Sequence, residues 1–292
     1  MIQSMTGYAG ASTDTARGTL CIELRSVNAR FLDLQFRNSD ELRALEPLLR
    51  EMLSARLARG KVDCRLFLGG ETAVPVGASL NAEAIARLRE LSAEVLKAMP
   101  QASPLHVADV LRWPSVIAQP AVGEDELRGI ASSLCRKALD ELVASRGREG
   151  AKLAAAVGER VAAMRQRLDD IAPRLPEALS AYQAKLSERL KEAVGSADDE
   201  RVRTEVAVFA GKVDVDEELT RLRAHLGEVD ETLKRGGAGS SPVGKRLDFI
   251  AQELNREANT LASKAASAEI SDCGLELKLL VEQIREQVQN IE

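Results

Sequence analysis

Four polar side chains that could hold a metal ion or move a proton recur along one predicted helix near the C-terminal end of the sequence. They are Glu253, Glu257, Thr260 and Lys264. On a helical wheel with about 100° per residue they form a stripe beside an apolar seam, and Glu257 lies within about 20° of the apolar Ile250 on that wheel. A carboxylate at that border is costly to bury unless a cation, a hydrogen-bond donor or a metal compensates it. The helix at residues 247–261 is therefore the first place to look for function.

A second predicted helix, which precedes a glycine-rich turn at residues 236–241, carries Glu218 and His225. These two residues are seven apart and therefore share a helix face. If the turn closes a helical hairpin, His225 lies level with Ala251 and Glu218 lies level with Ala258. Both are then within about two helical turns of the glutamates on the other helix.

The hairpin predicts a mixed cluster of Glu218, His225, Glu253 and Glu257. Carboxylates with an imidazole can bind Mn²⁺, Mg²⁺ or Zn²⁺, and they can also act as general acid and base without a metal. The alternative is structural. A single helical histidine is often a surface or core residue, and the glutamates could pair with neighbouring cations such as Arg246, Arg256 or Lys264.

The turn itself contains a spacing that resembles a phosphate-binding loop. Gly239, Gly244 and Lys245 fit that pattern, but Arg246 stands where a Ser or Thr should hold Mg²⁺. Pro242 also removes a backbone N–H donor. The sequence therefore favours a simple connection between helices over a nucleotide site.

Basic residues gather in the N-terminal part of the chain. Arg25 lies on one predicted strand, Arg30 follows a bend, and Lys61 lies on another strand just after Arg59. If the strands pair, these side chains form a small basic patch that could contact phosphates. A solvated sheet face is the alternative, because edge strands often carry charge.

The pattern of elements predicts an α+β fold: a small N-terminal β-sheet with a helix, then a long, mostly α-helical part with a helical hairpin. Ser39 is a predicted N-cap and Gly60 the predicted end of the first helix. Ser103-Pro104 is the predicted start of a short helix that ends before Pro114, and Pro173 and Pro176 should kink a long helix. The predicted strands lie at residues 4–9, 20–27, 31–36 and 61–68. The predicted domains are a mixed α/β domain at 1–122, a helical connecting region at 123–200 and a helical domain with the candidate site at 201–292.

The composition excludes several classes of protein. A formal net charge of −5 argues against an indiscriminate nucleic-acid binder, and 3% aromatic residues make base stacking on a sheet of aromatic platforms unexpected. The four cysteines match no metal or redox spacing. No apolar run is long enough to span a bilayer, and no secretory signal is visible, so we expect a cytoplasmic protein without membrane contact.

Longer motifs at both ends resemble the YicC/YloC family. The N-terminal motifs are Ser4-Met5-Thr6-Gly7-Tyr8, Arg25-Ser26-Val27-Asn28 with Arg30, Arg59-Gly60-Lys61-Val62 and Leu111-Arg112-Trp113-Pro114. The C-terminal motifs are Asp216-Glu217-Glu218-Leu219 with His225, Lys245-Arg246-Leu247-Asp248-Phe249, Asn255-Arg256-Glu257, Asn259-Thr260 and Ser263-Lys264. The middle of the chain matches only in helical character, and Ala265 stands where relatives often have serine.

The resemblance implies a bacterial cytoplasmic endoribonuclease that depends on a divalent metal ion, Mn²⁺ or Mg²⁺, and assembles as a homohexamer with an RNA channel. Onto matching positions it carries Glu218, His225, Glu253 and Glu257 as metal ligands. The catalytic residues would be His225, Glu257, Arg256 and Lys264. The RNA-binding residues would be Arg25, Asn28, Arg30, Lys61 and Asn259.

The hypothesis is therefore metal-dependent cleavage of RNA phosphodiester bonds, in which Arg256 and Lys264 stabilise charge on the phosphate. Its rival is a non-catalytic, oligomeric RNA-binding or adaptor protein whose carboxylate cluster is structural. The sequence leaves open whether water or the 2′-hydroxyl attacks.

Overall fold

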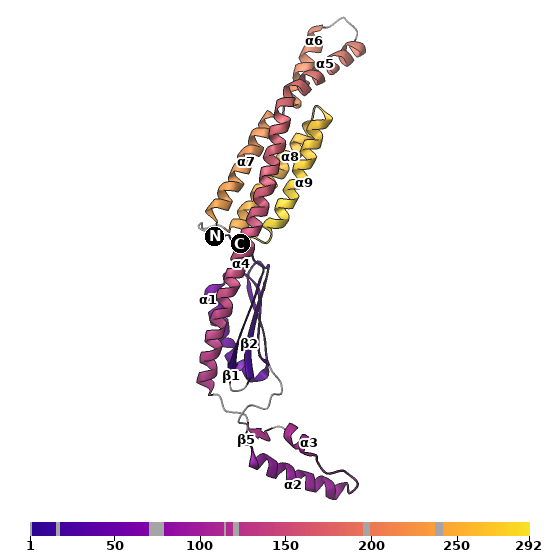
Figure 1. Ribbon diagram of the computed structural model, residues 1–292. Coiled ribbons are helices and arrows are strands. Elements are labelled where there is room, and N and C mark those ends of the chain that lie inside the picture. The colour runs from indigo at the N-terminus through magenta and orange to yellow at the C-terminus, as the bar shows by residue number, and fades with distance from the viewer. Residues whose placement is uncertain are drawn as a thin grey trace. The chain divides into compact units, whose positions relative to one another are not determined.

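The computed structural model describes residues 2–15, 18–69, 79–113, 115–118, 123–194, 199–236 and 242–292. It confirms the predicted α+β fold, with a small N-terminal sheet followed by long helices (Figure 1). Contacts divide the chain into a sheet unit, Tyr8–Leu142, and a helical unit that combines Met1–Gly7 with Val143–Glu292. This division differs from the three predicted domains, whose independence no observation tests and which stay a prediction.

The sheet unit contains a four-stranded sheet in the order β1-β2-β4-β3. Strand β2 pairs antiparallel with β4, and β3 pairs parallel with β4. The strands are β1 (Gly7–Thr15), β2 (Gly18–Val27), β3 (Leu32–Asn38) and β4 (Gly60–Gly69). The prediction placed the first strand at residues 4–9, but β1 begins at Gly7 because Ser4 pairs elsewhere in the chain.

Alternating residues of the strands form the inner face of this sheet. Leu20, Ile22 and Leu24 of β2 are fully buried, and Val62 and Leu66 of β4 are buried with them. Apolar residues of α1 (Glu46–Arg56) and of the first part of α4 (Glu124–Ile171) belong to the same core. The charged residues of β2 and β4 therefore lie on the outer face.

Two predictions about the first helix need correction. Ser39 makes no side-chain cap and precedes a 3₁₀ turn, η1 (Asp40–Leu45), rather than an α-helix. The helix that follows ends at Arg56, before Gly60. Gly60 instead opens β4 with a φ of 108°, a left-handed value that favours glycine.

The rest of the sheet unit consists of α2 (Ala82–Ala98), α3 (Val107–Arg112) and a two-stranded ladder of β5 (Ser79–Leu80) with β6 (Ile117–Ala118). Asn81 caps α2 by accepting hydrogen bonds from two backbone amides. The predicted start of α3 at Ser103-Pro104 is wrong. His106 is the N-cap residue, and its backbone amide donates to the Asp109 carboxylate at 3.2 Å.

The helical unit is built from the second part of α4 and the helices that follow it. These are the 3₁₀ turn η2 (Ala172–Arg174), α5 (Leu175–Val194), α6 (Asp199–Lys212), α7 (Asp216–Arg235), α8 (Val243–Lys264) and α9 (Ala268–Val288). The 3₁₀ turn interrupts the helix at Pro173, as predicted, whereas Pro176 lies in the first turn of α5 and does not interrupt it. Helix α8 packs between α7 and α9, as Figure 1 shows.

The first and last residues of the chain meet within the helical unit. Ser4 forms an antiparallel bridge with Ile291, and the Glu292 amide donates to the Gln3 carbonyl at 2.8 Å. The buried Arg146 donates from Nε to the Ser4 carbonyl at 2.6 Å and from Nη2 to the Glu292 carboxylate. The two chain ends are therefore tied to α4.

Some predictions fall outside the described residues. These are most of the loop at 69–80, the break at 195–198, Pro114, and the glycine-rich turn at 236–241 beyond Gly236. The spacing that resembles a phosphate-binding loop, from Gly239 to Lys245, lies partly outside the described residues as well. Among the described helices, none is long and apolar enough to cross a membrane.

Candidate functional site

The candidate site lies along the contact between α7 and α8. Each helix buries an apolar seam against the core of the helical unit and carries a polar stripe at the edge of that seam. The buried seams are Leu219, Leu222, Leu226 and Val229 on α7, and Leu247, Ile250, Leu254 and Leu261 on α8. Because the seams fix the rotation of both helices, they also bring the two polar stripes together.

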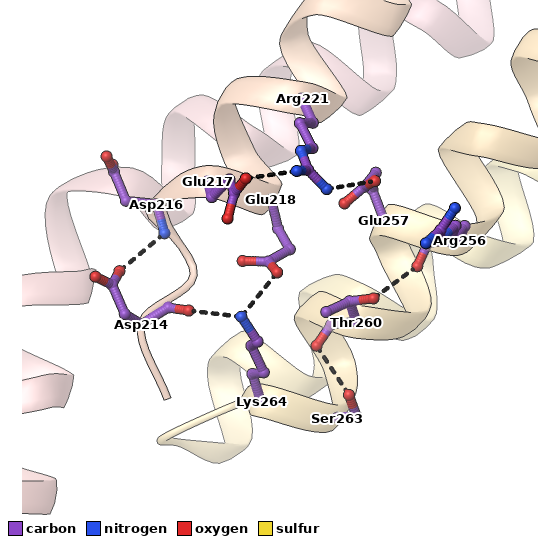
Figure 2. Close-up of polar contacts among 10 residues, drawn as sticks. All are labelled: Asp214, Asp216, Glu217, Glu218, Arg221, Arg256, Glu257, Thr260, Ser263 and Lys264. Atoms are coloured by element: carbon purple, nitrogen blue, oxygen red, sulfur yellow. Dashed lines mark hydrogen bonds and ion pairs between the residues drawn. The ribbon is translucent and has the colours of Figure 1, made fainter. Parts of the chain in front are cut away.

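Two ion pairs cross from one stripe to the other (Figure 2). Lys264 Nζ lies 2.9 Å from Glu218 Oε1, and Arg221 Nη1 lies 3.5 Å from Glu257 Oε1. The side chains of both glutamates are only 6% exposed, whereas their cations reach solvent. The costly burial of Glu257 expected from the sequence is confirmed, and a cation compensates it.

Further contacts hold the two cations in place. Arg221 Nη2 donates to Glu217 Oε1 at 2.5 Å, one turn earlier on α7. Lys264 Nζ donates to the Asp214 carbonyl at 3.3 Å, in the segment that precedes α7 (Figure 2). Each cation therefore joins two partners, and the C-terminal end of α8 is fixed to the start of α7.

The hairpin predicted from the sequence is confirmed by the contacts between α7 and α8. The prediction placed Glu218 level with Ala258. Glu218 pairs with Lys264, six residues further along α8, whereas Arg221 pairs with Glu257, within two residues of the predicted level. The spacing of four residues on each helix then puts His225 opposite Glu253. Contact between those two side chains stays a prediction.

Two polar atoms in this region are buried without a hydrogen-bond partner among the described residues: Glu218 Oε2 and His225 Nδ1. A buried polar group without a partner costs about 1–3 kcal/mol, and such groups in native proteins often belong to sites that take up a ligand. Both atoms are of the kinds that bind metal ions or accept protons.

Metal binding by Glu218, His225, Glu253 and Glu257 stays a prediction. Within the described part of the chain, no group of three or more histidine, cysteine, aspartate or glutamate side chains is placed to hold a metal ion. Glu218 and Glu257 are paired with Lys264 and Arg221 instead. The two unpartnered donor atoms fit a metal ion, but the described residues do not complete a ligand set for it.

The remaining residues proposed for catalysis and binding on α8 lie on its exposed side. Arg256 is exposed, and its carbonyl accepts a hydrogen bond from Thr260 Oγ1 at 3.1 Å. Asn259 is exposed and donates to Asn255 at 2.8 Å. Both flank the ion pairs rather than join them. Their predicted roles are untested.

Arg221 is a residue of the candidate site to which the sequence assigned no role, yet it bridges the two stripes. Its spacing of three from Glu218 and four to His225 is the signal that could have identified it, since such residues share a helix face.

The predicted basic patch of the sheet unit mixes both signs of charge. Arg25 and Lys61 lie on the outer face, but Arg25 stands opposite Asp63 in the β2–β4 ladder, and Glu23 stands opposite Arg65. Asn28 and Arg30 follow β2 and are exposed. The pairing of the strands is as predicted, and a role in RNA binding stays a prediction.

Comparison with known proteins identifies relatives along the whole chain. A family model described as "Endoribonuclease YicC-like, N-terminal region" matches residues 2–155, and one described as "Endoribonuclease YicC-like, C-terminal" matches residues 171–292. A "Probable endoribonuclease YicC" of Haemophilus influenzae is 38% identical over 296 residues, and one of Clostridioides difficile is 27% identical over 300 residues. Both alignments cover all of each chain. On this evidence and on the motifs at both ends, the chain belongs to the YicC-like family.

Proposed function

We propose that this protein is an endoribonuclease whose active site lies between α7 and α8. The names of the two relatives support the activity. The observation that carries the location is the presence of two unpartnered buried atoms, Glu218 Oε2 and His225 Nδ1, beside two cross-helix ion pairs. A site that is already charged and partly desolvated is suited to chemistry on a phosphodiester.

The side chains can be given roles by their chemistry. Lys264, Arg221 and the exposed Arg256 can hold a phosphate group and stabilise the charge that develops on it. His225 can accept or donate a proton near neutral pH. Glu257 and Glu218 fix the two cations when RNA is absent, and a phosphate can compete with them for those cations.

We also propose that a divalent ion, Mn²⁺ or Mg²⁺, takes part. When bound, such an ion supplies Lewis acidity and an activated water. Glu218, His225, Glu253 and Glu257 would be its ligands. We further propose that the protein acts in the cytoplasm as a homo-oligomer, a hexamer as in the family it resembles, which light scattering on the purified protein would measure.

The test uses labelled RNA and the purified protein. Wild type should cut RNA internally, and His225→Ala and Glu257→Gln should lower the rate at least about tenfold if either group acts in the transition state. Glu228→Gln is the matched control, because Glu228 is an exposed glutamate on the same helix as His225. Equal cleavage rates for wild type and the three variants, at unchanged oligomeric state, would show that the active site lies elsewhere in the protein.

Two further measurements define the reaction. Cleavage should stop in a chelator and return with added Mn²⁺ or Mg²⁺, and persistence in the chelator would reject the metal. A 2′,3′-cyclic phosphate at the product end would indicate attack by the 2′-hydroxyl, whereas a simple phosphate and a free hydroxyl would indicate attack by water.

The ion pairs give the non-catalytic alternative a specific basis. Lys264 with Glu218 and Arg221 with Glu257 have the geometry of ordinary cross-helix stabilisation. If the cluster is only structural, the protein should shift RNA on a native gel without cutting it in any divalent metal. That result would favour an RNA-binding or adaptor protein.

A further inference from the structure

Phe31 is an exposed aromatic residue at a fixed point of the sheet unit. It immediately precedes β3, and its carbonyl accepts a hydrogen bond from the Gly60 amide at 3.3 Å. The residue is 72% exposed, more than the other exposed aromatics among the described residues, Phe249, Tyr8 and Trp113. The sheet thus holds a large apolar ring in solvent at a defined position, which reduces the entropy lost when a flat ligand binds to it.

A cation already contacts this ring. The Arg30 guanidinium lies 5.2 Å from its centroid. Phe36 and Phe67 make similar contacts with Arg50 and Arg65, but their own side chains are half-buried. Phe31 differs because the ring beneath the arginine remains largely accessible.

Further cations lie at the same end of the sheet. Lys61 stands opposite both Val27 of β2 and Asp33 of β3, so it lies on the outer face where β3 begins. Arg25 lies on the same face two residues before Val27. Two carboxylates share this face at the same end of the sheet: Asp33, which stands opposite Lys61, and Asp63, whose Oδ1 lies 3.7 Å from Arg37 Nε. The cations Arg25, Arg30, Arg37 and Lys61 outnumber them. The surroundings of Phe31 are consequently suited to an anionic ligand that also carries a flat, stacking group.

We infer that Phe31 and Arg30 form a stacking site for one unpaired base of single-stranded RNA, with Arg25 and Lys61 contacting the adjacent phosphates. This deepens the proposed function and rests on it for the choice of ligand. Bases stack on aromatic side chains without regard to sequence, and arginine adds a cation–π contribution. The low aromatic content argued against a sheet of stacking platforms, but a single base needs only one ring.

The sequence offers a direct optical test, because it contains one tryptophan, Trp113. Trp113→Phe combined with Phe31→Trp makes residue 31 the sole tryptophan. Glu257→Gln in the same protein slows cleavage during the measurement. A 12-nucleotide oligouridine should quench the fluorescence of this tryptophan, whereas an abasic oligonucleotide of the same length should bind through its phosphates and quench much less.

Binding measurements on single variants complete the test. Phe31→Ala should weaken oligouridine binding about tenfold and leave binding of the abasic strand unchanged. Phe249→Ala is the matched control, because this ring is 62% exposed but lies on α8, and it should bind RNA like wild type.

The outcomes separate this inference from the proposed function. RNA binding that is insensitive to Phe31→Ala, or equal quenching by both strands, would overturn the stacking site while leaving the endoribonuclease intact. Base-dependent quenching of the tryptophan at residue 31, together with a wild type that never cuts RNA, would support the stacking site and reject the enzyme. A protein that binds no RNA would overturn both. A changed oligomeric state in Phe31→Ala with unchanged RNA affinity would mean that the ring contacts another protein chain.

Discussion

Replacing Lys264 by methionine should destabilise the protein, because it leaves the Glu218 carboxylate buried without its cation. The methionine keeps most of the volume of the lysine stem and removes the charge, together with the 3.3 Å hydrogen bond to the Asp214 carbonyl. Glu218 has one oxygen 2.9 Å from Lys264 Nζ and the other already without a hydrogen-bond partner. Nothing else in the described contacts compensates its charge.

The size of the effect follows from distance and burial. Coulomb's law with an effective dielectric constant of about 20 gives roughly 6 kcal/mol for unit charges 2.9 Å apart. Desolvation of a carboxylate that is only 6% exposed cancels much of this, and the 33% exposure of Lys264 reduces it further. We therefore expect Lys264→Met to lower the free energy of unfolding by about 2 kcal/mol.

A double-mutant cycle isolates the pair. Urea unfolding followed by circular dichroism, at one protein concentration, is measured for wild type, Lys264→Met, Glu218→Gln and the double variant. The double variant should lose about 1–2 kcal/mol less than the sum of the single losses, since it has no unpaired buried charge. Additive losses would refute the reasoning and would mean that Glu218 and Lys264 are retained for something other than their mutual attraction.

Three further predictions concern the core of each unit. Gly244→Ala should destabilise the helical unit by about 1–3 kcal/mol, because the added Cβ would overlap the Ile291 carbonyl. Gly227→Ala, which adds a Cβ in open space on α7, should stabilise the same unit by up to about 1 kcal/mol. Urea unfolding of both variants measures the two effects. Leu254→Ala should lower the free energy of unfolding by about 2–5 kcal/mol by the same measurement, since this side chain is 0% exposed; a loss below about 1 kcal/mol would contradict its place in the core. Burial raises the pKa of Cys64 from 9.0 to about 12, so the unfolded chain loses this proton at lower pH than the folded chain. The free energy of unfolding should therefore fall as the pH rises from 9 toward 12, and it should fall less steeply in Cys64→Ala. Equal pH dependence in the two proteins would contradict the shift.

The helices and strands that bury a seam could be predicted from the sequence, because their apolar residues repeat with the period of the element. Strand β4 and helix α8 are examples. The start of α3 could not be predicted in this way. Ser103-Pro104 has the residue types of a helix start, but the carboxylate of Asp109 favours a start at His106. The rules for helix starts selected Ser103-Pro104, and the folded chain begins the helix after His106.

The candidate site was predicted as a region but not as a set of contacts. The apolar seams of α7 and α8 determine which faces meet, so Glu218 and Glu257 were correctly placed on the shared contact. Their partners depend on helix register and on the reach of long side chains. Arg221 meets Glu257 within two residues of the predicted level, whereas Lys264 contacts Glu218 from six residues beyond it.

The tie between the chain ends affects the order in which the protein can mature on the ribosome. Residues 8–142 form the sheet unit and are synthesised early, so this unit can fold while translation continues. The first residues cannot complete their contacts until residues 290–292 have left the exit tunnel, because the Met5 amide donates to the Asn290 carbonyl, the Glu292 amide donates to the Gln3 carbonyl, and Arg146 binds Glu292. Arg146 must therefore wait, without the Glu292 carboxylate, while the second half of the chain is synthesised. Nascent chains that stall before residue 290 should expose this arginine to chaperones and proteases.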